Sequence, residues 1–218
     1  MSTAIFSDRE QAGALLADAL GELKGRDVVV LGIPRGGVVI ASRVAKALGA
    51  EMDIVVTKKI GAPGEPEFAL GAVTQEGDVI LNEDVVGLLG VEAGYLKSEA
   101  ARKAEEVKER MARFRGDRPY PSLGGKVVVI VDDGIATGST ASAAVKSVRK
   151  HAPASVIVAV PVAPAEVVAA LSEEADRVVC LATPEPFFAI GQFYEKFDQV
   201  EDDEVRRLLG EFWASRLT

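Results

Sequence analysis

Five short runs of apolar, mostly β-branched residues alternate with helical patterns, and this alternation constrains the fold more than any other feature. The runs are Val28–Ile33, Asp53–Val56, Val127–Val131, Val156–Val160 and Val178–Leu181. Near-continuous apolar runs of this length indicate strands that are buried on both faces. The helical candidates are Asp8–Leu23, Val38–Leu48, Thr140–Lys150 and Pro164–Glu174. We therefore predict an α/β fold with a mostly parallel twisted sheet flanked by helices.

Two segments interrupt the alternation. Ala69–Val73 and Val79–Leu81 flank the polar residues 75–78 and predict a hairpin beside the sheet. Between Val91 and Arg115, Glu alternates with Lys and Arg at helical spacing, which predicts a solvated surface helix supported by ion pairs. No shift in composition marks a linker. We expect residues 1–218 to form a single domain that carries the segment 91–115 as a charged helical insertion.

Composition and charge exclude several classes of protein. The formal net charge of −8 argues against a chain that binds nucleic acid by neutralising phosphates. Cys180 is the only cysteine, so Cys-based zinc clusters and intrachain disulfides cannot form. His151 is the only histidine. We expect His151 to be solvated at the end of a helix. The chain shows neither a signal-peptide pattern nor an apolar stretch long enough to cross a membrane, so we expect a cytoplasmic protein.

The most informative segment is Val127–Thr140, VVVIVDDGIATGST. A buried strand ends in Asp132 and Asp133, and a loop of small and hydroxyl residues leads into a helix. Ligands of open α/β sheets bind outside the carboxyl ends of the strands, where this loop must lie. The amides of residues 136–140, together with the helix N-terminus, predict a cradle for a phosphate monoester.

The alternatives explain this segment less well. It lacks the Gly-Lys-Ser/Thr of a P-loop and the GxGxxG of a dinucleotide site. A plain strand-to-helix turn explains the glycines but leaves the two carboxylates without a role. Carboxylates beside a phosphate would repel it unless each binds something else, and ribose hydroxyls, with or without Mg²⁺, are the expected partners.

This segment closely resembles the phosphoribosyl-pyrophosphate signature of type I phosphoribosyltransferases. The resemblance implies that Asp132 and Asp133 hold the ribose hydroxyls and contact Mg²⁺ indirectly or through the substrate. It assigns the 5′-phosphate to the loop that follows, namely Ala136, Thr137, Gly138, Ser139 and Thr140. The resemblance extends from about Val28 to Phe197.

Two further strand ends support the resemblance. The residues after the first strand resemble the family's pyrophosphate loop, and they are Pro34, Arg35, Gly36 and Gly37. The family's loop often holds a strained peptide before its basic residue, which implies a cis or otherwise strained Pro34–Arg35 bond. After the second strand, Lys58 and Lys59 resemble the basic pair that precedes the mobile catalytic loop, here Ile60–Phe68. Arg35, Lys58 and Lys59 are the implied catalytic residues.

The acceptor is the least defined part of the implied site. In the family a variable hood covers the base, and Thr183–Phe197 is the candidate here. Its Phe187, Phe188 and Tyr194 are candidates for stacking on a flat ring, although most of the aromatic side chains in this segment are expected to fix the hood to the core. Ala136 stands where the enzymes of hypoxanthine and guanine salvage have an acid, which disfavours a 6-oxopurine acceptor.

The resemblance implies a Mg²⁺-dependent transfer of the phosphoribosyl group from phosphoribosyl pyrophosphate to a nitrogenous base, with release of pyrophosphate. It also implies a homodimer, because members of the family are commonly dimers. Nucleic acids and membranes are not expected partners. The alternative is a sensor that binds phosphoribosyl pyrophosphate or a nucleotide on the same fold without catalysing the reaction.

Overall fold

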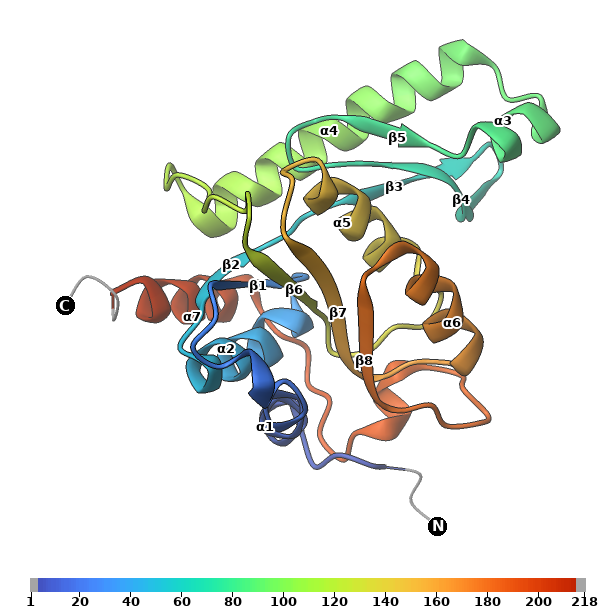
Figure 1. Ribbon diagram of the computed structural model, residues 1–218. Coiled ribbons are helices and arrows are strands. Elements are labelled where there is room, and N and C mark those ends of the chain that lie inside the picture. The colour runs from blue at the N-terminus through green and yellow to red at the C-terminus, as the bar shows by residue number, and fades with distance from the viewer. Residues whose placement is uncertain (1–3, 215–218) are drawn as a thin grey trace.

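The computed structural model describes residues 4–214, and of residues 66 and 67 only the backbone. Its main sheet has five strands in the order β2-β1-β6-β7-β8, and every neighbouring pair is parallel. The strands are β1 (Val28–Gly32), β2 (Glu51–Ile54), β6 (Val127–Val131), β7 (Ser155–Val162) and β8 (Arg177–Ala182). The predicted α/β fold is therefore confirmed (Figure 1).

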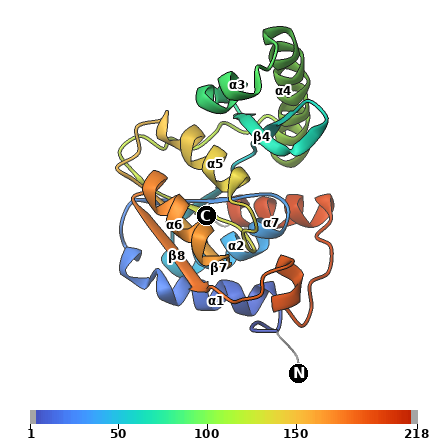
Figure 2. The same ribbon diagram turned by 90° about the vertical axis from the view of Figure 1, so that its right-hand side faces the viewer.

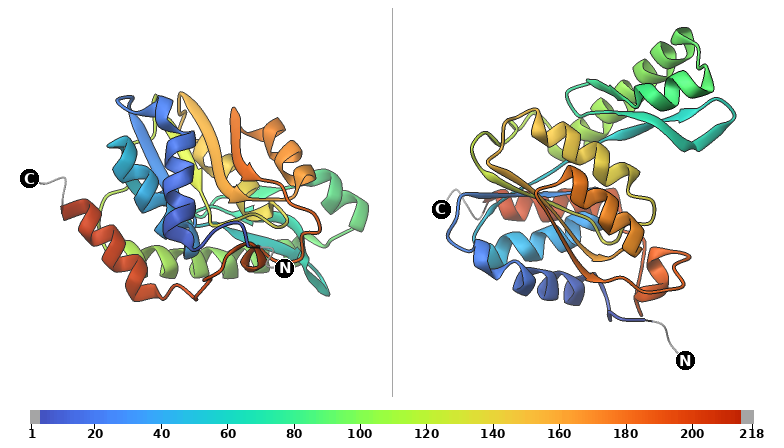
Figure 3. Two further views of the ribbon diagram at one scale, coloured as in Figure 1. Left: turned by 90° about the horizontal axis from the view of Figure 1, so that it is seen from below. Right: turned by 45° about the vertical axis from the view of Figure 1, so that its right-hand side comes forward.

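Helices cover both faces of this sheet (Figure 3). One face carries α1 (Arg9–Ala19), α2 (Gly36–Leu48) and α7 (Asp202–Ala214), and the other carries α5 (Ser139–Arg149) and α6 (Ala165–Glu174). Successive strand residues point to opposite faces, so Val129 joins the core under α2 while Val128 joins the core under α5. The chain also contains two 3₁₀ helices: η1 (Gly21–Leu23) precedes β1, and η2 (Ile190–Phe193) lies in the predicted hood.

The strand order contains a point where the chain changes direction across the sheet. β1 and β6 are neighbours, but the helix after β1 covers one face and the helix after β6 covers the other. The loops that leave these two strands therefore diverge and open a crevice between them, which is where ligands of such sheets bind. Both of the loops with the strongest motifs leave the sheet at this point.

A second, antiparallel sheet projects from the main body (Figures 1 and 2). It consists of β3 (Lys58–Ala62), β4 (Glu65–Val73) and β5 (Val79–Leu81), followed by α3 (Glu83–Leu89) and α4 (Ala93–Arg115). The hairpin predicted around residues 75–78 is thus confirmed as β4–β5. The segment Ile60–Phe68, expected to be a loop, is instead most of a second hairpin.

The physical reason for this difference is a small separate core. Ile60 and Leu70 are fully buried between the antiparallel sheet and α4, which outweighs the weak strand pattern of the segment. The glycines that suggested a loop lie at the irregular points of the hairpin: the pairing register shifts at Gly61, and Gly64 has a φ of +80° in the turn.

The helix α4 is less solvated than its charge pattern predicts. Val107 and Phe114 on one of its faces join the main core, and its last residue, Arg115, forms a buried ion pair with Asp53 of β2. The helix therefore runs from the projecting sheet back to the main body (Figure 1).

His151 and the lengths of the apolar helices can be compared with the sequence-based expectations. His151 lies just after α5 and is half exposed, with its Nε2 3.0 Å from the Oε1 atom of Glu76. Within residues 4–214, no helix is both long and apolar enough to cross a lipid bilayer.

Candidate functional site

The structure brings the two strongest motifs into contact. Ile33 after β1 donates a backbone hydrogen bond of 2.8 Å to the carbonyl of Val131 at the end of β6. A side chain at Gly36 would collide with the carboxylate of Asp133, and a Cβ at Gly37 would lie 2.6 Å from the Val131 carbonyl oxygen. Only glycine fits at either position. The Pro34–Arg35 peptide bond between these elements is cis, as the resemblance implied.

The loop of residues 136–140 forms the start of α5. Gly138 adopts a φ of +79°, the left-handed conformation that glycine accepts most readily, and precedes the first helical residue. Among the described residues, the amides of Ala136 to Thr140 donate to no other protein group. They face a cavity of about 210 Å³, which Asp132 and Thr140 also line. A helix N-terminus with uncommitted amides is a site for an anion.

Of the acidic pair, Asp132 lines this cavity and Asp133 is the next residue along the chain. The Asp133 amide donates a hydrogen bond of 2.8 Å to the Oδ1 atom of Asp132. Burial raises the pKa of Asp132 well above its ordinary value, and the adjacent negative charge of Asp133 raises it further. Burial also raises the pKa of Asp133, although the Arg9 guanidinium opposes that shift. Two carboxyl groups held this close favour a ligand that brings hydroxyl donors or a cation.

Arg9 is a site residue that the sequence analysis missed. Its Nε lies 2.7 Å from the Oδ2 atom of Asp133, and the guanidinium lies 3.8 Å from the ring centre of Phe197. It comes from the first turn of α1, 124 positions before its partner. No local pattern could have revealed this contact, since Arg9 looks like an ordinary residue at the start of a helix.

A basic cavity of about 290 Å³ lies beside the phosphate loop. Four of its lining residues are cationic: Lys58 and Lys59 from β3, and Lys103 and Arg110 from α4. Thr140 lines both this cavity and that of the phosphate loop, so the two are adjacent. The two basic residues of α4 were not predicted, because charged residues at helical spacing are usually solvated.

Arg35 faces a neighbouring cavity of about 370 Å³ that shares Lys58 and Arg110 with the basic cavity. Its Nη1 atom lies 3.6 Å from an Asp202 carboxylate oxygen at the start of α7 and 3.9 Å from a Glu201 oxygen. The amides of Arg35, Gly36 and Gly37 donate to no protein group in the described part of the chain. The start of α2 is thus a second helix N-terminus with uncommitted amides, the kind of feature that can bind an anion.

The predicted hood packs directly on the acidic turn. Ile190 of η2 lies so close to Gly134 that a Cβ there would be 2.5 Å from the Ile190 side chain. Tyr194 is only 5% exposed, its ring packs between Phe6 and Phe197, and its hydroxyl donates 2.6 Å to the Asp133 carbonyl. Burial strongly raises the pKa of this phenol, which therefore stays protonated as a donor.

The other two aromatic candidates of the hood differ in exposure. Phe187 packs on Phe193 at 4.9 Å between ring centres and is half-buried. Phe188 is 84% exposed. The structure thus uses Tyr194 as a support for the hood, leaves Phe187 partly accessible and presents Phe188 to solvent.

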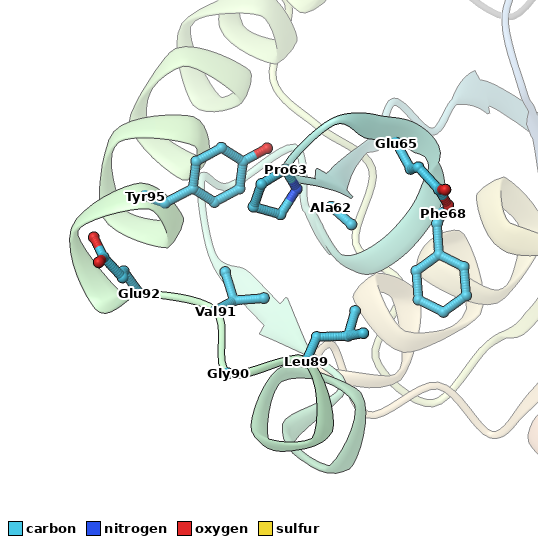
Figure 4. Close-up of a pocket in the computed structure, with 9 residues that line it drawn as sticks. All are labelled: Ala62, Pro63, Glu65, Phe68, Leu89, Gly90, Val91, Glu92 and Tyr95. Carbon is cyan, nitrogen blue, oxygen red and sulfur yellow. The ribbon is translucent and has the colours of Figure 1, made fainter.

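A further cavity, of about 620 Å³, lies in the projecting sheet (Figure 4). Its walls are mostly apolar, with Pro63, Phe68, Leu89 and Tyr95 pointing into it, and no basic residue lines it. The Tyr95 hydroxyl closes one side by donating 2.9 Å to the Gly61 carbonyl. This cavity lacks the groups that bind phosphate, so it is separate from the anion sites described above.

Comparison with known proteins agrees with this geometry. The sequence model of the phosphoribosyl transferase domain matches residues 7–197. The chain belongs to this family. A Mycobacterium tuberculosis H37Rv protein, Rv0571c, provisionally named a phosphoribosyl transferase, is 47% identical over 201 residues, which is 92% of this chain and 45% of the relative. A protein of strain CDC 1551 matches to the same extent. The chain thus spans less than half the length of these curated relatives.

Two solved structures share this fold. The crystal structure of TT1426 from Thermus thermophilus superposes with a TM-score of 0.86 at 47% identity, covering 95% of this chain and 98% of that one. The AQ2163 protein from Aquifex aeolicus has a TM-score of 0.51 at 16% identity and covers 84% and 78% of the two chains, a likeness in fold alone.

Proposed function

We propose that this chain transfers the phosphoribosyl group of phosphoribosyl pyrophosphate to a nitrogenous base and releases pyrophosphate. One observation carries the proposal. The uncommitted amides of the phosphate loop, the acidic pair and the basic cavity lie side by side at the switch point of the sheet. A molecule with a phosphate at one end, vicinal hydroxyls in the middle and a pyrophosphate at the other end matches that order of groups.

Each part of the donor has a counterpart in this arrangement. The amides and hydroxyls of residues 136–140 bind the 5′-phosphate, and Asp132 and Asp133 accept hydrogen bonds from the ribose hydroxyls. The amides of residues 35–37 receive the pyrophosphate, whose charge is balanced by the Arg35 guanidinium and by Lys58 and Lys59. Arg9 opposes the effect of burial on the pKa of Asp133 and holds its carboxylate in place beside the ribose.

The reaction follows from this placement. The bond between the anomeric carbon and the pyrophosphate oxygen breaks with its electron pair on pyrophosphate, and the acceptor nitrogen forms a new bond to that carbon. The proton lost from the nitrogen passes to the departing pyrophosphate. The transition state has oxocarbenium character, and preorganised cations and amides around the leaving group stabilise its growing negative charge.

The residues present also fit Mg²⁺. The described residues contain no cluster of three acidic, histidine or cysteine ligands. Mg²⁺ commonly binds through one or two carboxylates together with substrate phosphates, and Asp132, which no arginine contacts directly, supplies such a carboxylate with Asp133 beside it. When bound, the ion would neutralise pyrophosphate charge.

The hood determines the acceptor in this proposal. Tyr194 is enclosed by other rings and acts by supporting the Asp133 turn, so contact with the base falls to Phe187 or to the exposed Phe188. The proposal also includes a cytoplasmic location and a homodimer. Size-exclusion chromatography with light scattering tests the dimer.

A base-panel assay tests the function. The protein is incubated with phosphoribosyl pyrophosphate, Mg²⁺ and one base at a time, and pyrophosphate release is measured. We expect release with at least one base, and at least about tenfold less with Asp132→Asn and Asp133→Asn. Binding of the donor without release for every base would instead identify a sensor. No binding of the donor at all would disprove both functions.

A further inference from the structure

Helix α4 presents a row of charged residues to the basic cavity and to the neighbouring cavity that Arg35 faces. Lys103, Glu106 and Arg110 are spaced three and four residues apart and so lie on one face of the helix. They flank the buried Val107, which packs into the core and fixes the rotation of the helix. The row therefore faces these two cavities because of packing, whereas Lys108, on another side of α4, is exposed.

Arg110 is the first unusual member of this row. It is half-buried, and its Nη2 atom lies 3.5 Å from the carbonyl oxygen of Pro34, immediately before the pyrophosphate loop. No carboxylate within residues 4–214 forms an ion pair with it. Burial lowers its pKa, and the positive charges of Arg35 and Arg113 lower it further, against the opposing charge of Asp202. A desolvated cation beside other cations is costly unless an anion joins it.

Glu106 is the second unusual member. Its carboxylate lies 3.1 Å from the Lys103 amine and 3.5 Å from the Lys58 amine, so it bridges α4 and β3. It also lies 2.6 Å from the guanidinium of the exposed Arg102. Glu106 lines the neighbouring cavity that Arg35 faces, and its partners Lys58 and Lys103 line the basic cavity. Burial alone would raise the pKa of Glu106, but the hydrogen bond from Lys103 and the charges of Lys103, Lys58 and Arg102 together lower it. Glu106 is thus ionised, and it supplies an internal negative charge to two of the cations that line the cavity.

We propose that Lys103 and Arg110 of α4 bind the pyrophosphate group of the donor together with Lys58, and that Glu106 is an internal anion which the pyrophosphate displaces. The inference rests on the proposed function and deepens it. It turns the charged helix of the 91–115 segment into one wall of the substrate site. In that arrangement Lys58 and Lys103 exchange a carboxylate for a more highly charged diphosphate, and Arg110 gains its first anionic partner.

Calorimetric titration with inorganic pyrophosphate and Mg²⁺ tests this directly. Arg110→Gln and Lys103→Gln should each weaken binding about tenfold or more, because each loses a charge-assisted hydrogen bond. Arg110→Lys should recover part of the loss. Glu106→Gln should bind pyrophosphate several-fold more tightly, because the competing carboxylate is gone. Lys108→Gln makes the same charge change as Lys103→Gln on an exposed side of α4, and it should bind like the wild type.

A parallel titration with ribose 5-phosphate separates this inference from the proposed function. All five variants should bind ribose 5-phosphate like the wild type, because the phosphate loop and the acidic pair are untouched; this result also shows that they are folded. If Arg110→Gln and Lys103→Gln bind pyrophosphate normally, or if Glu106→Gln binds it no better than the wild type, the inference is overturned and the proposed function stands. If the wild type binds neither ligand, both fail.

Discussion

At the scale of single residues, the acidic pair is where stability and the proposed function oppose each other. Asp132 and Asp133 directly follow the fully buried strand β6, and the Arg9 guanidinium pairs with Asp133. The pKa of Asp132 is raised in the folded state by burial and by its neighbour. A carboxyl with a raised pKa stabilises the fold fully below its unfolded pKa, and this contribution is lost as the pH rises through the folded pKa.

Asp132→Asn should therefore be more stable than the wild type at neutral pH. One unit of raised pKa corresponds to about 1.4 kcal/mol, which for a chain of this size is about 3–5 °C in Tm. The amide oxygen can still accept from the Asp133 amide. The gain should shrink as the pH falls, because Asp132 then becomes neutral in the wild type as well. Thermal unfolding at several pH values measures it, with the exposed Asp117→Asn as control. A difference in Tm between Asp132→Asn and the wild type that does not change with pH would contradict this prediction.

At the scale of elements, the buried pair between β2 and α4 holds the wall of the site in place. The Arg115 Nε and Nη2 atoms lie 2.7 and 2.9 Å from the two carboxylate oxygens of Asp53, and the guanidinium also donates to the carbonyls of Arg118 and Pro119. All three nitrogens of this guanidinium thus donate hydrogen bonds to groups of the protein. The pair fixes the end of the helix that carries Arg110 five residues earlier.

Replacing one partner of this ion pair should lower the free energy of unfolding far more than replacing both partners. Arg115→Met leaves a buried carboxylate and should lose about 3–5 kcal/mol, whereas Asp53→Leu combined with Arg115→Met should recover much of that loss. Urea denaturation measures the free energy of unfolding of the single variants and the double variant. Equal losses for Arg115→Met and for the double variant would show that the pair is not coupled.

The elements also show how far the sequence determines the fold. The helices α2 and α5 begin and end within two residues of their predicted limits, because Gly49 takes the left-handed conformation after α2 and the strand-end loops fix both starts. The helix α7 was missed although Val205, Leu208, Leu209 and Phe212 repeat at helical spacing. The β3–β4 hairpin was missed because its stability comes from contacts with α4, which are distant in sequence.

The site itself could be predicted only where it follows the chain locally. The place of a strand-end loop such as that of Asp132 and Gly138 can be predicted from the sequence, because parallel strands all end at one edge of the sheet. The roles of Arg9 and Arg110 cannot be predicted from the sequence, because they depend on which helices pack against those loops in the fold. A charged helix pattern gives the same sequence signal whether its charges face water or a ligand.

At the scale of the whole molecule, the candidate site has two walls that are anchored differently. The hood is tied to the main core: Phe193 and Tyr194 are buried there, and the Phe193 carbonyl accepts hydrogen bonds from the amides of Ile5 and Phe6. The β3–β4 hairpin belongs to a separate and smaller core, in which Ile60, Ala62, Leu70, Val73 and Ala100 are the buried members. Fewer buried contacts mean a lower free energy of local opening.

Hydrogen exchange should therefore be faster in the hairpin than in the main sheet or the hood. Phosphoribosyl pyrophosphate with Mg²⁺ should slow exchange at residues 58–68 and 132–140, because the donor would connect the hairpin to the phosphate loop through Lys58 and Thr140. The hood should change little until an acceptor base is added, since its backbone is already held by Ile5 and Phe6. Exchange measured by mass spectrometry with the donor, with the donor plus base, and with sulfate as an anion control separates these steps. If the donor alone protects the hood and leaves residues 58–68 unchanged, the wall that closes over the donor is the hood and not the β3–β4 hairpin.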